Sequence, residues 1–340
     1  MDRRRAVGIA LVFVAAFAFG SASVLARPVY DTGLGWLGLV TWRFIIGAGF
    51  AWLWVAASPG RRAAVGRLSR RQLAVTIALG ALFTGNSGTY YAALETVPAA
   101  LAGVLVYTYP VMVAVLSIRF ATRLPGRRPW IALVLAFGGV VLALGGIDVA
   151  TAPPTSGIIL VVASSVIYSV WIIASARLSG ERSDRLADDA GRPVDSTSDA
   201  AVTTAVMITS TAVVDSLLSI VTGGSLDPRA VPATAWPSVF AIGFLASFLA
   251  IQAFYAGARR IGAAQAALLS TVEPAIIVTL AWVFLGQRLD PIQFVGAGLI
   301  MVSVVVAQTA PRPLGAPAPA MPLDAETPTD DEAQRPAIRP

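Results

Sequence analysis

The chain has 340 residues, of which 56% are hydrophobic and only 13% are charged, and its formal net charge is +6. A soluble domain carries about 25% charged residues, so this composition excludes an ordinary soluble domain and indicates a polytopic membrane protein. Ten spans of about 20 residues would use roughly 200 residues and leave the rest for short loops and a tail.

The chain also lacks three residue types that many mechanisms need. It has no Cys and no His, and all 25 of its basic residues are Arg. Without Lys there is no phosphate-binding loop of the Gly-x-x-x-x-Gly-Lys type, which excludes ATP-driven transport by this chain. Without His or Cys, the usual zinc sites, a Cys nucleophile and a Ser-His pair are excluded as well. We therefore expect no cofactor and no metal.

Ten apolar runs follow one another along the chain and predict ten transmembrane helices, that is, an all-α integral membrane protein. They lie at about 6–26, 34–57, 73–96, 98–120, 130–148, 157–178, 201–223, 236–258, 262–286 and 290–308. The first run follows three Arg residues and resembles a signal peptide. Because it is longer than a usual signal-peptide core and nine runs follow it, we interpret it as an uncleaved first helix.

Two polar segments lie outside these runs. Residues 179–200 mix acidic residues with Arg and are typical of a solvated cytoplasmic loop. Residues 309–340 contain 8 of the 22 prolines and an acidic run, a composition that cannot bury much apolar surface. We expect these last residues to form a disordered cytoplasmic tail.

The positions of the Arg residues predict the topology, because cytoplasmic loops hold an excess of positive charge. If the N-terminus is cytoplasmic, 18 Arg residues fall on the cytoplasmic side: Arg3, Arg4, Arg5, Arg61, Arg62, Arg67, Arg70, Arg71, Arg119, Arg123, Arg127, Arg128, Arg177, Arg182, Arg185, Arg192, Arg259 and Arg260. The opposite side holds Arg27, Arg229 and Arg288. This bias favours ten spans with both termini cytoplasmic. It also explains the basic charge, so we expect no nucleic-acid partner.

The second half of the chain repeats part of the first half at a distance of 164 residues. At this spacing Tyr91-Ala92-Ala93 aligns with Tyr255-Ala256-Gly257, and Pro110 aligns with Pro274, without a gap. The match pairs the third and fourth predicted helices with the eighth and ninth. Because five helices is an odd number, the second copy must enter the membrane from the opposite side. We predict two inverted five-helix repeats at 1–150 and 151–308, an arrangement typical of secondary transporters.

Several short motifs in both halves resemble the two repeats of an EamA-type carrier of the drug/metabolite transporter superfamily. They are Gly20-Ser21, Trp42-Arg43-Phe44, Tyr91-Ala92-Ala93-Leu94 through Pro110, Tyr168-Ser169, and Tyr255-Ala256 through Glu273-Pro274. The resemblance covers about residues 6–308 and implies a ten-helix fold that exports small metabolites such as amino acids. In that family Glu-Arg-Leu commonly follows each proline-bearing helix. This chain has Thr122-Arg123-Leu124 and Gln287-Arg288-Leu289 there, so the acid is missing from both repeats.

Ionisable side chains inside a span are costly and are therefore candidates for function. Arg43 and Asp215 each lie roughly 12 to 13 Å from the outer end of their helices, at 1.5 Å per residue. Their matched depth predicts an ion pair, serving as a structural tie, a gate or a substrate clamp. Glu95 lies at the outer end of the third predicted helix, where we expect a structural role.

Glu273 lies near the middle of its predicted helix, and Tyr109 is its repeat counterpart. Each stands directly before a proline, Pro274 or Pro110, which removes a backbone hydrogen bond and can kink the helix, leaving a carbonyl one turn earlier free to face a cavity. Glu273 is therefore predicted to be a central binding or proton-coupling carboxyl, the alternative being a protonated Glu bonded to a freed carbonyl. Further polar and aromatic side chains of the third, sixth and eighth helices are candidates for the same lining, the alternative for each being packing or interface anchoring: Asn86, Tyr90, Tyr168, Trp171 and Gln252.

These observations favour a secondary transporter that exports a small metabolite, amino-acid-like or drug-like, across a bacterial inner membrane by alternating access. Its expected partners are the lipid bilayer, a small-molecule substrate and, for one mechanism, protons. Both a monomer and a homodimer stay open. The alternatives are an uncoupled facilitator, a membrane enzyme acting on lipid-linked substrates and a non-transporting scaffold. The enzyme would need a cluster of catalytic groups at one membrane face, and the acidic residues of the 179–200 loop come without His or Cys.

The Arg distribution makes a testable prediction about topology. Reporter domains fused after residue 308 and inserted into the 179–200 loop should both report the cytoplasm, because both sites fall on the Arg-rich side. Alkaline phosphatase and green fluorescent protein fusions measure this directly. An external signal from the 179–200 insertion would contradict the ten-span topology.

Overall fold

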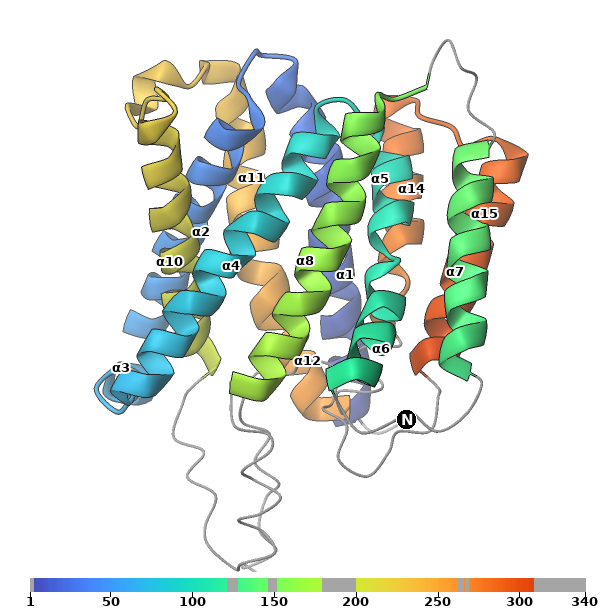
Figure 1. The fold of residues 1–340 in the computed structure, drawn as a ribbon. Helices are drawn as coiled ribbons and strands as arrows, with labels where there is room; N and C mark the ends of the chain where they lie inside the picture. The colour runs from blue at the N-terminus through green and yellow to red at the C-terminus, as the bar shows by residue number, and fades with distance from the viewer. Residues whose placement is uncertain are drawn as a thin grey trace, which may run out of the picture.

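A computed structural model describes residues 3–120, 128–145, 152–178, 200–261, 266 and 269–308. Within these ranges every regular element is a helix, and the helices run up and down as one bundle (Figure 1). Two predicted segments, most of the 179–200 loop and the tail 309–340, lie outside the described residues, as does Thr122-Arg123-Leu124. The prediction of an all-helical protein is confirmed for the described part of the chain.

The main helices match the predicted apolar runs to within a few residues at most of their ends. Their bounds are α1 (Arg3–Tyr30), α2 (Trp36–Ala56), α4 (Arg70–Leu94), α5 (Ala99–Val106), α6 (Tyr109–Phe120), α7 (Arg128–Gly145), α8 (Thr155–Leu178), α10 (Ala200–Val221), α11 (Trp236–Phe244), η3 (Leu245–Leu249), α12 (Ala250–Ile261), α14 (Glu273–Leu285) and α15 (Pro291–Gln308). Three short elements lie outside the runs: α3 (Pro59–Val65), η1 (Pro228–Ala230) and η2 (Ala233–Ala235).

Five stretches of helix are long and apolar enough to cross a membrane by themselves, namely Arg3–Tyr30, Trp36–Ala56, Thr155–Ser175, Ala200–Val221 and Ala233–Ala258. Shorter apolar helices stand beside them, among them Ala99–Val113 and Glu273–Leu285. The protein is therefore a helical membrane protein of several spans. The count of ten stays a prediction.

Several helix ends are fixed by recognisable capping groups. Ser69 and Gln72 form a capping box at the start of α4, in which each side chain accepts from the other residue's backbone N–H. Gly286 ends α14 because its φ of 65° is a left-handed conformation that glycine adopts without strain. At the end of α2, Arg61 donates to the carbonyl oxygen of Trp54 at 2.8 Å and stacks over its ring.

Three spans contain irregular backbone where the sequence analysis expected continuous helix. The fourth run is divided into α5 and α6 by a turn at residues 107–108, and a second turn at 271–272 comes directly before α14. The two turns are 164 residues apart, which is the spacing of the sequence repeat. In the eighth run, Leu245–Leu249 form a π-helical turn between α11 and α12. Such turns are frequent at functional sites.

Helix α1 occupies the middle of the bundle, where it contacts α12 and α14, and α4 packs against α8 and α10. Helices α7 and α15 form a closely packed pair at one side (Figure 1). A Cβ atom added at Gly296 of α15 would lie 2.6 Å from the carbonyl oxygen of Gly139 on α7. The two backbones touch because neither residue has a side chain, and small residues of this kind let helices approach closely.

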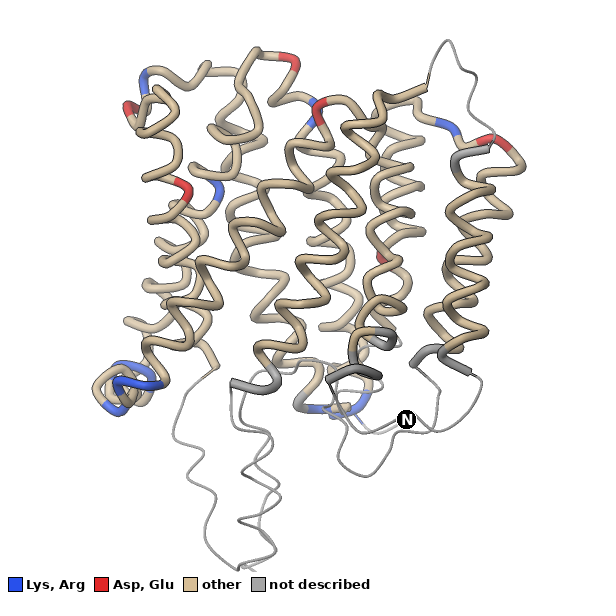
Figure 2. Tube along the Cα trace, viewed as in Figure 1, with Lys and Arg blue, Asp and Glu red and all other residues tan. Residues whose placement is uncertain are grey.

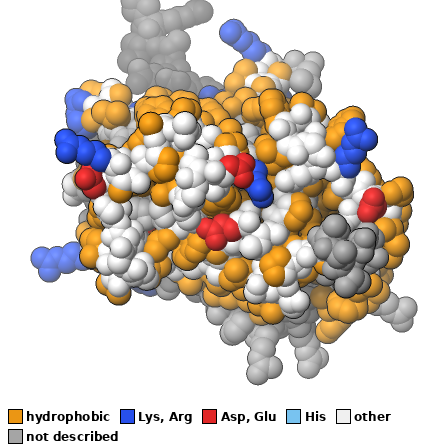
Figure 3. Space-filling view, turned by 90° about the horizontal axis from the view of Figure 1, so that it is seen from above, with side chains coloured by type: hydrophobic (Ala, Val, Ile, Leu, Met, Phe, Trp, Pro, Cys, Tyr) orange, Lys and Arg blue, Asp and Glu red, His pale blue; other side chains and the backbone are white. Residues whose placement is uncertain are grey.

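The charged residues lie mostly at the two ends of the bundle. The Arg cluster of α3 and the start of α4 is at the lower end, and basic and acidic residues are scattered over the upper end (Figure 2). Seen from above, the upper end carries a few acidic and basic side chains, some of them side by side, among apolar ones (Figure 3). Which end faces the cytoplasm stays a prediction.

The contact between α7 and α15 generates a stability prediction with an internal control. In Gly296→Ala the new methyl group would lie 2.5 Å from the backbone nitrogen of Ala143, so the helices must move apart. We expect a loss of about 1–3 kcal/mol, the usual cost of overpacking, seen as a lower Tm in detergent.

Gly298, one half-turn further along α15, is exposed, and a Cβ atom there meets nothing within 4 Å. Gly298→Ala should therefore leave the Tm unchanged or raise it, since alanine favours helix. Equal Tm values for the Gly296 and Gly298 variants would contradict the close contact.

Candidate functional site

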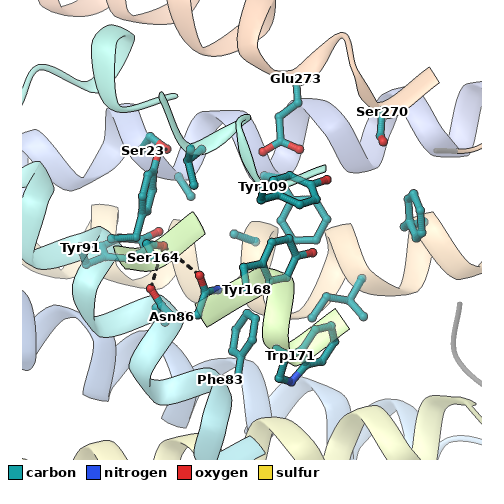
Figure 4. Close-up of a pocket in the computed structure, with 18 of the residues that line it drawn as sticks. Ser23, Phe83, Asn86, Tyr91, Tyr109, Ser164, Tyr168, Trp171, Ser270 and Glu273 are labelled. Carbon is teal, nitrogen blue, oxygen red and sulfur yellow. Dashed lines mark hydrogen bonds between the residues drawn. The ribbon is translucent and has the colours of Figure 1, made fainter. Parts of the chain in front are cut away.

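A cavity of about 270 Å³ lies inside the bundle (Figure 4). Its walls come from both predicted repeats: α1, α2, α4, α5 and α6 of the first, and α8, α10, η3, α12 and the start of α14 of the second. Ten of the lining residues are Phe, Tyr or Trp, and the charged residues among the described lining are Arg43 and Glu273. The cavity is therefore largely aromatic, with one acid and one base.

The structure brings most of the predicted site residues to this cavity. Those that line it are Arg43, Asn86, Tyr90, Tyr109, Tyr168, Trp171 and Glu273. Gln252 and Asp215 are not among the described lining residues. The amide nitrogen of Gln252 is buried without a hydrogen-bond partner in the described part of the chain.

The two prolines stand in the first turn of a helix that begins inside the bundle. Tyr109 is the first residue of α6 and Glu273 is the first residue of α14, with Pro110 and Pro274 directly behind them. Because proline has no N–H, it cannot bond the carbonyl four residues earlier, which is that of Val106 or of Ser270.

Each of these two carbonyl groups is bound instead by a side-chain hydroxyl from another part of the chain. Ser165 of α8 donates to Val106 O at 3.1 Å, and Tyr107 donates to Ser270 O at 2.9 Å. Inside a membrane such partners are needed, because there is no bulk water to satisfy a free carbonyl. These bonds thus hold the breaks in a defined shape beside the cavity.

The hydroxyl that reaches Glu273 belongs to Tyr107, which lies 3.0 Å from Glu273 Oε2. The sequence repeat pointed to Tyr109, the counterpart of Glu273, as a site residue and gave no indication of Tyr107. The Tyr109 ring instead packs 5.6 Å from the Tyr107 ring and 4.7 Å from the Tyr168 ring, centroid to centroid. Tyr107 could have been found from its position three residues before Pro110, where the proline interrupts the helix.

The aromatic side chains form one connected wall. Tyr168 and Trp171 are nearly parallel, with centroids 5.8 Å apart, and Phe83 lies against both rings (Figure 4). The indole N–H of Trp171 donates to the carbonyl of Leu79 at 3.0 Å, which fixes the ring between α8 and α4. The wall therefore presents ring faces, which suit apolar, planar or cationic groups.

Two hydrogen bonds hold the polar lining residues at the other side of the cavity. Ser164 donates to the side-chain oxygen of Asn86 at 2.8 Å, which leaves the Asn86 amide N–H groups to serve as donors (Figure 4). Ser23 of α1 and Tyr90 of α4 join their hydroxyls at 2.9 Å. Ser23 and Ser164 were also missed, because a single serine in an apolar helix gives no distinctive pattern.

The expected ion pair between Arg43 and Asp215 is wrong for this structure. The guanidinium of Arg43 lies over the rings of Phe44 and Tyr91, 4.3 and 4.5 Å from their centroids, and its Nε donates to Ser247 at 3.1 Å. Ser247 comes from the π-helical turn, which no sequence pattern announced. Matched depth therefore pointed to two residues that are neighbours in the structure, but it carried no information about the direction of their side chains.

Asp215 is completely buried, and within the described residues neither carboxyl oxygen has a hydrogen-bond partner. Arg43 and the hydroxyl of Thr84 are close neighbours of the Asp215 carboxyl. The Thr84 hydroxyl is likewise buried and without a hydrogen-bond partner in the described residues. Asp215 therefore lies behind the cavity wall, next to Arg43 but not bonded to it.

Glu95 has the structural position that its place in the sequence suggested. Its carboxyl oxygen accepts from the backbone N–H of Trp36 at 2.6 Å, at the N-terminus of α2. An acid is favourable there because it satisfies a free N–H and meets the positive end of the helix dipole. Glu95 thus ties α4 to α2 outside the cavity.

The sequence was compared with models of known protein families. The model of the EamA-like transporter family matches residues 6–145 and 190–309. The chain belongs to this family. Members of this family are transporters. The match confirms the resemblance that the short motifs indicated.

The fold is similar to that of solved structures as well. Twenty-five chains match, and one of them, titled only "Crystal structure of protein", is 20% identical with a TM-score of 0.57. That match covers 88% of this chain and 96% of the other, and at this identity it shows a shared fold alone. The search of curated proteins gave no match.

One position where this EamA-like chain departs from the expected motif has a defined role. Gln287 stands where Glu is common in the family, and its side-chain oxygen accepts from the backbone N–H of Ala100 at 3.2 Å. It thereby satisfies one of the free N–H groups at the start of α5. The neutral amide can fill this structural role without an acid.

The arrangement of Arg43 and Asp215 predicts unequal effects of their substitution. Arg43→Gln loses a buried hydrogen bond and two ring contacts, and we expect it to lower the unfolding free energy by about 2 kcal/mol. Asp215→Asn replaces a carboxyl that has no bonded partner by a neutral group of the same size, so stability should be unchanged or higher.

Equilibrium unfolding in detergent of the two single variants and the double variant measures this. A direct buried ion pair would instead give losses of about 3–5 kcal/mol for either single change. Large and equal losses for both variants, recovered in the double variant, would contradict the structure.

Proposed function

We propose that this protein is a secondary transporter that exports a small metabolite across the bacterial inner membrane by alternating access. In this proposal ten spans form two inverted five-helix repeats, and both termini are cytoplasmic. The observation that carries it is a cavity inside the bundle beside two helix breaks 164 residues apart, in a chain of a transporter family. Broken helices around a midplane site are a recurring design of such carriers.

The lining of the cavity favours an amino-acid-like or drug-like substrate. The connected rings of Phe83, Tyr109, Tyr168 and Trp171 offer an apolar surface to the body of the molecule. Glu273 suits a cationic group, and the N–H donors of Arg43 suit an acidic one. A volume of about 270 Å³ limits the substrate to a small metabolite.

Glu273 is the residue on which coupling would depend. It is a carboxyl in the cavity, at the start of α14, and it has a single described hydrogen-bond partner, Tyr107. Such a group can hold a proton in one half of the cycle and release it, or exchange it for a cationic part of the substrate, in the other half. We favour coupling, because the chain has no His or Lys and Asp215 lies outside the cavity lining.

The alternatives make different use of the same cavity. An uncoupled facilitator would use it without titration of Glu273. A membrane enzyme acting on lipid-linked substrates would need a catalytic cluster at a membrane face, and in the described ranges no group of three or more His, Cys, Asp or Glu residues is suited to hold a metal ion. The enzyme alternative does not explain why the two breaks face one cavity, and the facilitator differs from our proposal only in the role of Glu273.

Transport by purified protein in proteoliposomes tests the proposal. The probes are labelled L-amino acids, among them phenylalanine, and the cationic dye ethidium, each measured by counterflow and with an imposed pH gradient. We expect saturable counterflow of at least one probe, accelerated by the gradient. Failure of every probe to exceed empty liposomes would contradict export of this substrate class.

Glu273→Gln separates the roles of the carboxyl, because the amide keeps the shape of the side chain but cannot release a proton. If Glu273 couples transport, counterflow should persist and the response to the pH gradient should disappear. A weaker affinity with an intact gradient response would instead indicate binding of a cationic group. The matched control is Glu95→Gln, which keeps an oxygen for the Trp36 N–H and should retain both properties. Unchanged rate, affinity and pH response in Glu273→Gln would contradict any role for Glu273.

A further inference from the structure

The hydroxyl of Tyr107 contacts two acceptors at once. It lies 2.9 Å from the carbonyl oxygen of Ser270 and 3.0 Å from Oε2 of Glu273. A phenol has one hydrogen to donate. Both contacts can therefore be full hydrogen bonds only if one of the partners supplies the second hydrogen.

The chemistry of the two partners decides which one can do so. A backbone carbonyl only accepts, whereas a carboxyl donates when it is protonated and accepts when it is ionised. With Glu273 protonated, its O–H donates to the Tyr107 oxygen, and the Tyr107 hydrogen goes to Ser270 O. With Glu273 ionised, the charged carboxylate is the stronger acceptor and takes the Tyr107 hydrogen, so Ser270 O loses that bond.

The carbonyl of Ser270 belongs to the helix break directly before α14. Pro274 cannot donate to Ser270 O, so the Tyr107 hydroxyl takes the place of the missing backbone donor. Tyr107 itself is the residue that ends α5, in the turn of the other break. The Tyr107–Ser270 bond therefore connects the two helix breaks beside the cavity, which both residues line.

The corresponding carbonyl in the first repeat has a different kind of partner. Val106 O accepts from Ser165 at 3.1 Å, and Ser165 also lies 3.2 Å from Val161 O on its own helix. No carboxyl takes part in this pair of contacts. The hydrogen bond at the break before α6 should therefore not change when Glu273 gains or loses a proton. The hydrogen bond at the break before α14 should change.

We propose that Tyr107 is a positioning residue that transmits the protonation state of Glu273 to the break before α14. When Glu273 is protonated, the Tyr107 hydroxyl donates to Ser270 O and stabilises the backbone turn before α14. When Glu273 loses its proton to the cavity, the Tyr107 hydroxyl donates to the carboxylate instead, and the turn before α14 loses this hydrogen bond. The proposal rests on the proposed function in taking Glu273 as the coupling group, but the exchange of hydrogen bonds itself needs no substrate.

The other groups that face Glu273 do not disturb this exchange. They are the phenols of Tyr90, Tyr109 and Tyr168, which are neutral at ordinary pH, and Arg43, which lines the same cavity. Arg43 donates to Ser247 and is covered by two rings. Glu273 is thus the one carboxyl among the described groups that line this cavity.

Backbone hydrogen exchange of the full chain in detergent, read by mass spectrometry, tests the proposal without any ligand. The reporters are the amides of Val272 and Ile276, whose hydrogen bonds cross the break, and protection is corrected for the intrinsic pH dependence of exchange. In the wild-type protein we expect protection of this segment to fall about threefold to tenfold as Glu273 ionises, the value of one hydrogen bond. The amides of Val111 and Met112 in α6 are the internal control and should not respond.

Two variants give opposite results if the proposal is right. Glu273→Gln cannot ionise, so the segment should stay protected at all pH values. Tyr107→Phe lacks the hydroxyl, so the same segment should be weakly protected at all pH values. The control is Tyr30→Phe, which removes a phenol that donates to Tyr91 O and is not among the described lining residues of the cavity; it should leave the protection of this segment as in the wild type. A Tyr107→Phe protein that keeps the wild-type pH response would overturn the proposal.

A second measurement does not depend on the folding of the Tyr107 variant. The phenol bands of isotope-labelled tyrosine in the infrared spectrum should change with pH in the wild-type protein and should not change in Glu273→Gln. Identical pH responses in these two proteins would also overturn the proposal. If the exchange and infrared results hold but Glu273→Gln transports normally with its pH response intact, the hydrogen-bond exchange stands and the coupling role in the proposed function fails.

Discussion

The structure depends on the need to satisfy every backbone carbonyl in a region without bulk water. Pro110 and Pro274 each remove one donor from a helix inside the bundle, and an unsatisfied carbonyl in hydrocarbon costs several kcal/mol. Ser165 of α8 meets this need at Val106 O, and Tyr107, from the turn of the other break, meets it at Ser270 O. Two breaks of this kind stay in place only where protein surrounds them, which is why the cavity and the breaks occur together.

The same constraint explains how the cavity differs from the outer surface. Side chains such as Val134 and Phe137 of α7 are 71% and 70% exposed, as expected for helices that face lipid. Polar groups are instead directed inward and bonded to one another, as in the pairs Ser164–Asn86 and Ser23–Tyr90. The aromatic wall lies between these pairs and Glu273, so a substrate would meet ring faces along its length and ionisable groups at particular points.

Much of this arrangement can be predicted from the sequence because it follows from periodic or repeated features. Apolar runs gave the helices, the 164-residue repeat located both breaks, and burial cost drew attention to Glu273 and Arg43. Side-chain direction is set by packing and has no such pattern, so the repeat led to Tyr109 rather than Tyr107. Likewise, nothing in the sequence announced the π-helical turn that carries Ser247 to Arg43, and equal depth alone suggested an ion pair with Asp215.

The central claim is that the cavity opens in turn to both sides of the membrane, and accessibility of a single cysteine tests it most directly. The chain has no Cys, so Ala22→Cys in the cavity lining provides one thiol, and Val134→Cys on the lipid-facing surface is the control. Both are treated with a membrane-impermeant maleimide added to either face of oriented vesicles. The account predicts that Ala22→Cys is labelled from both faces and Val134→Cys from neither. Labelling of Ala22→Cys from one face only, or from neither face, would contradict it.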